Sequence, residues 1–347
     1  MTSVTMLTVP TTGPGDTAAL TALAAAGYGP SDVVSVIGKT EGNGCVNDFS
    51  RTLAATVWEP LLPEDAVTVF SGGTEGVLSP HVNLLVRDER PSGHERGLVA
   101  AVGHTAPIPP QDLGRRGQVE AVAARVGELL DDLGVTADDA HLVLVKCPLL
   151  TSATMAQMRT EGLEPVTDDT YESMAWSRAA SALGTAVALG ECDLEAAVAA
   201  LGGDGEIWSS RASASAGAEL TDCHVLVLAT SGSASNPLRA VHGAMRDAID
   251  VATLTDLFAQ VEQEGGEVVQ VFAKAEADPT GTVRGLRHTM LTDSDLNSTR
   301  HARAAVGGLV AALRGSTDVY VSGGAEHQGP PGGGSVTVVY RVPEASA

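Results

Sequence analysis

The sequence predicts an α/β protein built from three homologous units, and two repeated patterns support this prediction. The first pattern is a serine followed by small residues, a glycine and a glutamate. Its copies are Ser71-Gly-Gly-Thr-Glu75, Ser215-Ala-Gly-Ala-Glu219 and Ser322-Gly-Gly-Ala-Glu326. Each copy leads into a short apolar run that is typical of a buried strand. Because the spacings are long and unequal, the copies indicate repeated domains rather than a solenoid.

The second pattern lies upstream of each serine. A lysine closes an apolar run rich in β-branched residues, and an arginine then opens an alanine-rich stretch typical of a helix. The lysines are Lys39, Lys146 and Lys274, and the arginines are Arg51, Arg178 and Arg303. The order lysine, arginine, serine therefore recurs in every predicted unit.

We expect repeat units over residues 1–105, 111–251 and 255–347. The proline-rich segment 106–110 separates the first two units, because it suits neither a helix nor a strand. Asp48 is expected to cap the helix that carries Arg51. The other elements expected, in chain order, are a strand over 4–9, helices over 16–26, 118–133, 171–189 and 238–249, and a glycine-rich loop over 323–334 before the last strand.

Composition and charge exclude several classes of protein. The formal net charge of −22 is unfavourable for binding nucleic acid or an anionic membrane surface. No apolar stretch approaches the roughly 18 residues of a membrane span, and no signal peptide is recognisable. The four cysteines lack CxxC spacing and the histidines lack an HExxH pattern, which counts against a disulfide framework and a catalytic zinc site. We therefore expect a soluble, cytoplasmic protein.

A lysine and a serine in every unit are candidates for a nucleophile and its base. The lysine must be neutral to accept the serine proton, so its pKa must fall from about 10.4 to about 7–8, a cost of roughly 4 kcal/mol. Burial beside other cations supplies such a shift. Any one of these lysines, taken alone, is more simply an ordinary residue at a strand end. The threefold repetition favours the chemical interpretation.

Several longer segments resemble the ring-opening amidohydrolases, a family that acts on cyanuric acid or barbituric acid. The resemblance extends from about residue 30 to residue 340 of the sequence. It rests on 38–48 (Gly-Lys-Thr-Glu-Gly-Asn-Gly-Cys-Val-Asn-Asp), 71–81 (Ser-Gly-Gly-Thr-Glu-Gly-Val-Leu-Ser-Pro-His), 146–150 (Lys-Cys-Pro-Leu-Leu), 170–174 (Thr-Tyr-Glu-Ser-Met), 213–217 (Ser-Ala-Ser-Ala-Gly) and 321–330 (Val-Ser-Gly-Gly-Ala-Glu-His-Gln-Gly-Pro).

The resemblance implies a role for each repeated residue, in three units arranged around a pseudo-threefold axis with a central active site. Ser215 is implied as the nucleophile and Lys146 as its general base, with Lys39 and Lys274 in the equivalent places. The implied substrate-binding residues are Arg51, Arg178, Arg303, Ser71, Gly72, Ser215, Ala216, Ser322 and Gly323. The implied metal site consists of Glu276, Ala325, Gln328, Gly329, Pro330 and Gly333.

The implied reaction is hydrolytic ring opening of cyanuric acid by a Ser-Lys dyad. Barbituric acid as the substrate, or a small-molecule binding protein without catalysis, are the alternatives. No organic cofactor is expected, whereas a structural magnesium or calcium ion and a homotetramer are. The residues alone do not decide which of the three lysine-serine pairs reacts, although only the middle unit has an alanine, Ala216, in the place of Gly72 and Gly323.

Overall fold

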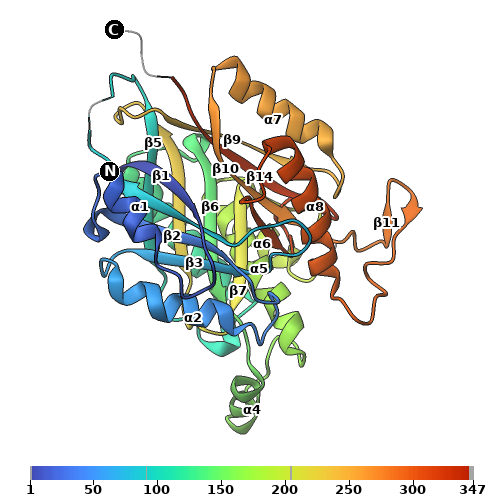
Figure 1. The fold of residues 1–347 in the computed structure, drawn as a ribbon. Helices are drawn as coiled ribbons and strands as arrows, with labels where there is room; N and C mark the ends of the chain where they lie inside the picture. Colours follow the sequence, from blue (N-terminus) through green and yellow to red (C-terminus); the bar gives the residue numbers. More distant parts are fainter. Residues whose placement is uncertain (1, 91, 204, 344–347) are drawn as a thin grey trace.

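The computed structural model describes residues 2–90, 92–203 and 205–343, and it consists of mixed sheets with helices packed outside them (Figure 1). The chain forms three successive sets of four main strands, and each set has its own helices. The first set contains β1 (Thr2–Pro10), α1 (Ala19–Ala25), β2 (Val33–Thr40), α2 (Phe49–Trp58), β3 (Val67–Gly72) and β4 (His81–Arg87).

The second and third sets continue this alternation. The second contains β5 (Gly97–His104), α3 (Arg116–Leu133), β6 (Ala140–Pro148), α4 (Ser152–Thr160), α5 (Thr170–Ala188), α6 (Leu194–Ala200), β7 (Ala212–Gly217) and β8 (His224–Ser231). The third contains β9 (Leu238–Met245), α7 (Val251–Gln263), β10 (Glu267–Ala275), a small hairpin of β11 (Thr282–Val283) and β12 (Leu286–Arg287), α8 (Ser298–Arg314), β13 (Tyr320–Gly323) and β14 (Gly334–Arg341).

All three sets have the same strand order, with the third strand at one edge and the first at the other. The orders are β3-β2-β4-β1, β7-β6-β8-β5 and β13-β10-β14-β9. In each set the second and third strands are parallel and a helix connects them, while the remaining pairs are antiparallel. A short pairing of β1 with β5 joins the first two sets into one eight-stranded sheet. The predicted threefold α/β architecture is therefore confirmed.

One shared core holds the three sets together. Its buried side chains come from all three, and they include Met6 of β1, Leu144 of β6 and Phe272 of β10. Separate clusters fill the space between each sheet and its own helices. Because side chains alternate along a strand, each sheet has one face toward the shared core and one toward its helices. Because both faces of each sheet are buried, many of its strands consist largely of apolar residues.

The structure corrects one predicted element and leaves the unit boundaries as a prediction. Residues 238–249 were expected to form a helix, but Leu238–Met245 is the strand β9. Its small and polar side chains fit a helix pattern locally, while pairing with β14 along its whole length decides the outcome. Strand β5 lies within the predicted first unit but pairs with β8, and the predicted gap at 251–255 falls inside α7. These pairings favour boundaries before β5 and before β9.

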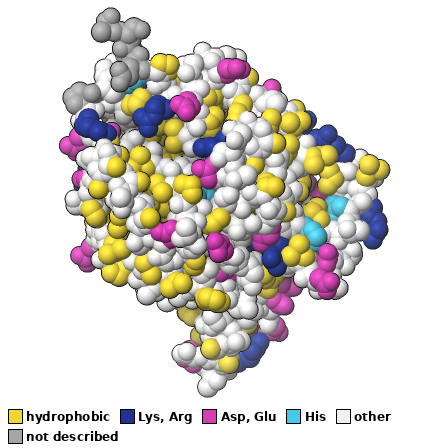
Figure 2. All heavy atoms as spheres, viewed as in Figure 1, with side chains coloured by type: hydrophobic (Ala, Val, Ile, Leu, Met, Phe, Trp, Pro, Cys, Tyr) yellow, Lys and Arg dark blue, Asp and Glu magenta, His cyan; other side chains and the backbone are white. Residues whose placement is uncertain are grey.

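Polar caps fix the start of each helix that carries a repeated arginine. Asp48, Asp169 and Asn297 accept backbone N–H groups at the first turns of α2, α5 and α8, as Ser/Thr/Asp/Asn caps do. The predicted role of Asp48 is thus confirmed. Within the described residues, no helix is long and apolar enough to cross a membrane. On the face in Figure 2, acidic and basic side chains are scattered and do not form a continuous basic surface.

Candidate active site

The parallel strands of each set place one lysine directly beside one serine. The partners in register are Lys39 and Ser71, Lys146 and Ser215, and Lys274 and Ser322. Residues opposite each other on adjacent strands point to the same face, so each lysine reaches toward its serine. We call these pairs the first, second and third rows. All six side chains are buried, and the lysines are at most 2% exposed.

The first and third rows are closed by hydrogen bonds. Lys39 Nζ donates to Ser71 Oγ at 3.3 Å, and Lys274 Nζ donates to Ser322 Oγ at 3.2 Å. Lys274 also donates to the carbonyl oxygen of Ala214 at 2.7 Å, which ties the third row to the second set. Ser71 Oγ donates to Ser322 Oγ at 3.3 Å, so two of the three rows meet at the centre of the molecule.

The second row is open. Lys146 Nζ and Ser215 Oγ are buried, but no hydrogen bond joins them. Lys146 instead lies 3.3 Å from the carboxylate of Glu219. Tyr320 is a neighbour of both Ser71 and Ser215, and its ring lies 5.7 Å from Lys39 Nζ. A polar ligand at the centre would therefore reach Ser215 without breaking a lysine-serine hydrogen bond.

The lysines also differ in how readily they hold a proton. Burial keeps the pKa of Lys39 and of Lys274 well below the usual lysine value, and the charges of Arg303 and Arg178 act in the same direction. Burial lowers the pKa of Lys146 as well, but the carboxylate of Glu219 opposes this effect, and the pKa is about 8. A pKa of about 8 lets Lys146 exchange a proton in both directions near neutral pH.

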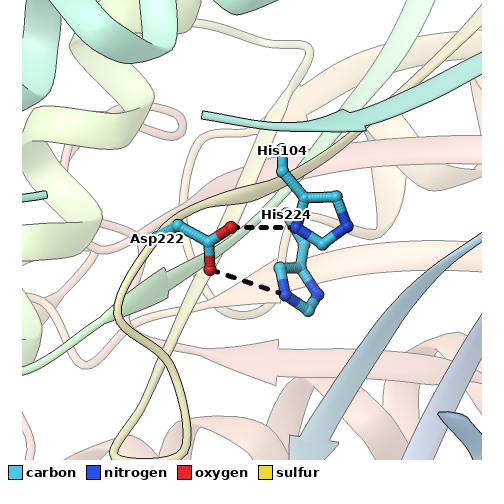
Figure 3. A group of neighbouring side chains, drawn as sticks. All are labelled: His104, Asp222 and His224. Carbon is cyan, nitrogen blue, oxygen red and sulfur yellow. Dashed lines mark hydrogen bonds and ion pairs between the residues drawn. The ribbon is translucent and has the colours of Figure 1, made fainter. Parts of the chain in front are cut away.

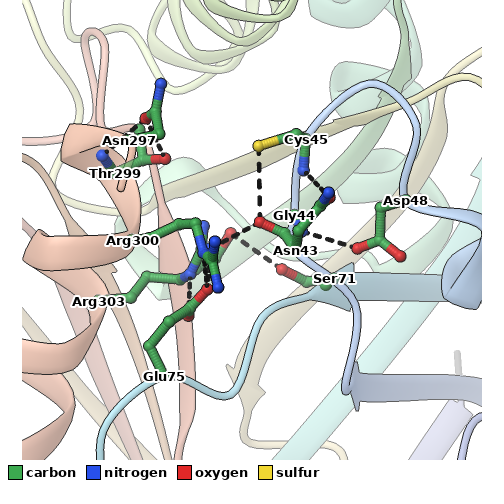
Figure 4. Close-up of polar contacts among 12 residues, drawn as sticks. Asn43, Gly44, Cys45, Asp48, Ser71, Glu75, Asn297, Thr299, Arg300 and Arg303 are labelled. Atoms are coloured by element: carbon green, nitrogen blue, oxygen red, sulfur yellow. Dashed lines mark hydrogen bonds and ion pairs between the residues drawn. The ribbon is translucent and has the colours of Figure 1, made fainter. Parts of the chain in front are cut away.

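Each repeated arginine lies near the glutamate of another set, and two of the three pairs are hydrogen-bonded. Arg303 binds Glu75 through two nitrogens at 2.7 and 2.8 Å (Figure 4). Arg178 binds Glu326 in the same way, at 2.6 and 2.8 Å. Two-nitrogen pairing of this kind fixes the plane of the guanidinium group. Arg178 and Arg303 are thus oriented, and the three arginine-glutamate pairs link the three sets in a ring.

The third link of this ring is loose. Arg51 Nε lies 3.7 Å from Glu219, and its other nitrogens donate to the carbonyl oxygens of Ala216 and Cys45. Glu219 is left with one carboxylate oxygen that has no hydrogen-bond partner among the described residues. Although burial opposes ionisation, Lys146 and Arg51 lower the pKa of Glu219, so it is a carboxylate. Its charge acts on Lys146 instead of fixing an arginine.

The small residues after the serines are needed where the arginines approach the backbone. A Cβ atom added to Gly323 would lie 2.7 Å from Arg303 Nη1, and one added to Gly72 would overlap Asp48. Gly324 and Gly73 adopt left-handed backbone conformations beside Arg178 and Arg303. The middle turn accepts the methyl group of Ala216, which is buried.

The residues predicted to hold a metal ion are only partly brought together. Glu276, Ala325 and Gly329 line a cavity of about 310 Å³. Burial and the charge of Glu326 raise the pKa of Glu276 to about 7, as for a buried carboxylate that a cation would stabilise. Several of the predicted ligand groups already have partners, since the Ala325 carbonyl oxygen accepts the N–H of Gln328 at 2.8 Å and Glu276 Oε2 accepts that of Gly332 at 3.1 Å. The Gln328 side-chain oxygen accepts the N–H of Ala214 at 2.6 Å, and the carbonyl oxygen of Pro330 accepts that of Gly333 at 2.9 Å.

Sequence reasoning missed the roles of four residues at this site. Glu75, Glu219 and Glu326 belong to the repeated serine pattern but had been given no function, although their threefold recurrence was the available signal. Tyr320 had no such signal, because the positions two residues before the other serines are Val69 and Ser213. The predicted lysines, serines and arginines do converge on one centre, and their individual roles stay predictions.

Comparison with known proteins agrees with this architecture. Residues 5–341 match the family model described as amidohydrolase ring-opening protein. A cyanuric acid amidohydrolase of Rhodococcus sp is 65% identical, over 99% of this chain and 97% of its own, and one of Pseudonocardia dioxanivorans is 64% identical over 99% of each chain. A solved structure of a cyanuric acid hydrolase, described as an innovation by structural concatenation, has a TM-score of 0.93 at 44% identity, and the match covers 99% of this chain and 100% of that one. The chain belongs to the family of ring-opening amidohydrolases.

Proposed function

We propose that the enzyme hydrolyses cyanuric acid, opening the ring to carboxybiuret, which then loses carbon dioxide to give biuret. The relatives with the printed name cyanuric acid amidohydrolase support this substrate. The geometry supports it as well, because three similar lysine-serine rows surround one centre and cyanuric acid has three identical carbonyl groups. Each carbonyl oxygen would face one arginine and one serine turn.

The second row is our choice for the reacting pair, with Ser215 as nucleophile and Lys146 as base. The observation that carries this choice is that, of the three rows, only the second lacks a hydrogen bond between its lysine and its serine. Ser215 Oγ is therefore not held by a lysine in this state, and its hydroxyl group is available to a bound substrate. The pKa of Lys146, about 8, also suits a group that takes and returns a proton.

The reaction then needs only these two side chains and water. Neutral Lys146 takes the Ser215 proton while Oγ attacks a ring carbonyl carbon. The ring C–N bond breaks, the leaving nitrogen takes the proton from Lys146, and the opened chain remains on Ser215 as a carbamate ester. A water molecule gives its proton to Lys146 and attacks this carbonyl carbon. The bond to Oγ breaks, and Lys146 returns the proton to Ser215.

The other rows and the arginines bind the substrate in this proposal. Arg51, Arg178 and Arg303 donate to the ring oxygens, which carry more charge as the ring opens. The backbone N–H groups of the serine turns add further donors, at Ser71-Gly72, Ser215-Ala216 and Ser322-Gly323. Because Glu75 and Glu326 fix two of the arginines, those donors are in place before the substrate arrives.

A structural magnesium or calcium ion, without an organic cofactor, completes the proposal. Glu276 fits a hard cation because it is a buried carboxylate with a raised pKa, and loop carbonyl oxygens from Ala325 to Gly333 would complete an oxygen ligand set. The ion would neutralise the repulsion between Glu276 and Glu326 and thereby keep Glu326 on Arg178. We expect Glu276→Gln, or chelation of the wild type, to lower the melting temperature measured by calorimetry. Unchanged melting after both treatments would reject the metal site.

We also propose a cytoplasmic homotetramer. All four cysteines are free, as in proteins of reducing compartments. On α2, Phe49 is 78% exposed and Leu53 is 43% exposed, which leaves an apolar surface for a second copy. Light scattering of the purified protein should give four times the chain mass of 35.3 kDa. A monomer would contradict this part of the proposal.

The activity itself is tested by incubating the protein with cyanuric acid and following biuret and carbon dioxide. Equimolar release of both products is the expected result. Binding of cyanuric acid without product would indicate a binding protein and reject the proposed reaction.

A further inference from the structure

Two histidines and an aspartate lie together at the edge of the second set, outside the three rows (Figure 3). His104 ends β5 and His224 begins β8, and the two are direct partners in the strand register. Asp222 lies two residues before His224 in the preceding loop. One potential ligand atom from each residue can be chosen so that all three lie within 4.8 Å of one another. Strand pairing, not sequence proximity, creates this group.

The distances suit a shared ion. His104 Nδ1 lies 2.9 Å from one oxygen of Asp222, and His224 Nε2 lies 3.8 Å from the other. Neighbouring ligands around a tetrahedral ion at 2.0–2.1 Å are roughly 3.3 Å apart, which lies between these two values. Because all three ligand atoms lie within 4.8 Å of one another, rotations of the more exposed His104 and Asp222 side chains would place three donors around one point.

A backbone contact prepares His224 for this role. Its Nδ1 lies 2.9 Å from the carbonyl oxygen of Thr68, which can only accept, so the ring proton is on Nδ1. The lone pair of Nε2 then faces Asp222. Metal-binding histidines typically donate their second N–H to a carbonyl or carboxylate in this way.

The group is open on one side and is particular to the second set. The His104 side chain is 41% exposed and Asp222 is 21% exposed, whereas His224 is 9% exposed, so an ion could enter from solvent and retain a water molecule. The corresponding partners in the other sets are Pro10 with His81, and Ala244 with Ser335. Neither pair offers two nitrogen ligands.

We propose that His104, Asp222 and His224 bind a divalent transition-metal ion of the zinc type, with water in the fourth position. Two imidazole nitrogens and one carboxylate select such an ion over magnesium or calcium, which prefer oxygen ligands alone. This site is therefore distinct in position and chemistry from the oxygen-rich loop around Glu276. The proposal is independent of the substrate and of the reacting row.

Titration of the intact protein with Zn²⁺ by calorimetry, in excess Mg²⁺ to fill oxygen sites, tests the proposal. We expect one site per chain, and His104→Ala should weaken its affinity by at least about tenfold, because the loss of even an outer partner of a metal ligand typically costs that much. Asp222→Asn, which keeps the shape and an acceptor for His104, should weaken binding similarly. Co²⁺ should give the visible spectrum of nitrogen and oxygen coordination, without a thiolate band.

His301→Ala is the matched control, because His301 Nε2 also lies 2.9 Å from an aspartate, Asp293, at the surface. It should leave the Zn²⁺ affinity and stoichiometry unchanged. The proposal fails if His104→Ala and Asp222→Asn bind Zn²⁺ as the wild type does, since the group is then a histidine-aspartate hydrogen bond only. It also fails if His301→Ala reduces binding as much as His104→Ala.

Discussion

The second row differs from the first and third rows in where its glutamate points. Glu75 and Glu326 each hold an arginine through two short hydrogen bonds, and the lysines of the first and third rows bind their serines. Glu219 lies 3.7 Å from Arg51 but 3.3 Å from Lys146. A threefold repeat in sequence therefore gives three unequal sites, because the Glu219 carboxylate lies closer to a lysine than to an arginine.

Removing the proposed reacting groups of the second row should have the largest effect on catalysis. Ser215→Ala and Lys146→Ala should each lower kcat by about 10⁴-fold or more, because neither group can act without the other. For the same reason the double variant should be scarcely slower than either single variant. Steady-state assays on cyanuric acid, with circular dichroism to confirm folding, measure this. Multiplicative losses in the double variant would show that the two residues do not form one unit.

The first and third rows should respond through binding. Ser71→Ala and Ser322→Ala remove a donor at the centre and leave a buried partner unpaired, which costs about 1–3 kcal/mol. We expect kcat/KM to fall by about tenfold to two-hundredfold, mainly through KM. If either variant is as inactive as Ser215→Ala, with KM unchanged, the assignment of the second row is wrong.

Barbituric acid tests whether the site binds all three edges of the ring in the same way. Its CH₂ group replaces one ring N–H, so a site that pairs all three edges leaves one buried polar group unsatisfied, at about 1–3 kcal/mol. The near-identity of the turns at 71–75 and 322–326 favours such a symmetric site. We predict that kcat/KM for barbituric acid is lower by about tenfold to a few hundredfold, with inhibition of cyanuric acid turnover. Equal kcat/KM values for the two rings would contradict this prediction.

Glu219→Gln should have the smallest effect at the optimum and the most specific one on pH dependence. The neutral form of Lys146 is required, so kcat/KM rises with pH through its pKa of about 8. Because the Glu219 charge raises that pKa, its removal should move the acidic limb to lower pH. Glu75→Gln, whose carboxylate binds Arg303, is the matched control and should leave the limb in place. If the acidic limb of the pH profile is unchanged in Glu219→Gln, Glu219 does not raise the pKa of Lys146.

The repeated residues and the overall architecture could be predicted from the sequence, but the different contacts of the second row could not. Lysine, arginine and serine recur at strand and helix ends, so the α/β class and the three sets could be predicted, whereas the convergence of these side chains on one centre was implied only by the family resemblance. The strand β9 was missed because its pattern is weak locally and its pairing with β14 is long-range. The position of Glu219 closer to Lys146 than to Arg51 could not be predicted either. The two distances, 3.3 and 3.7 Å, differ by only a few tenths of an ångström.

The most direct test of the central claim is to identify the serine that carries the opened ring. Rapid acid quenching during turnover, followed by peptide mass spectrometry, would locate the covalent intermediate. Ring opening releases no fragment, so the modified peptide should gain the whole mass of cyanuric acid. We predict this addition on Ser215 and its absence in Ser215→Ala. The same addition on Ser71 or Ser322 in the wild type would contradict the account.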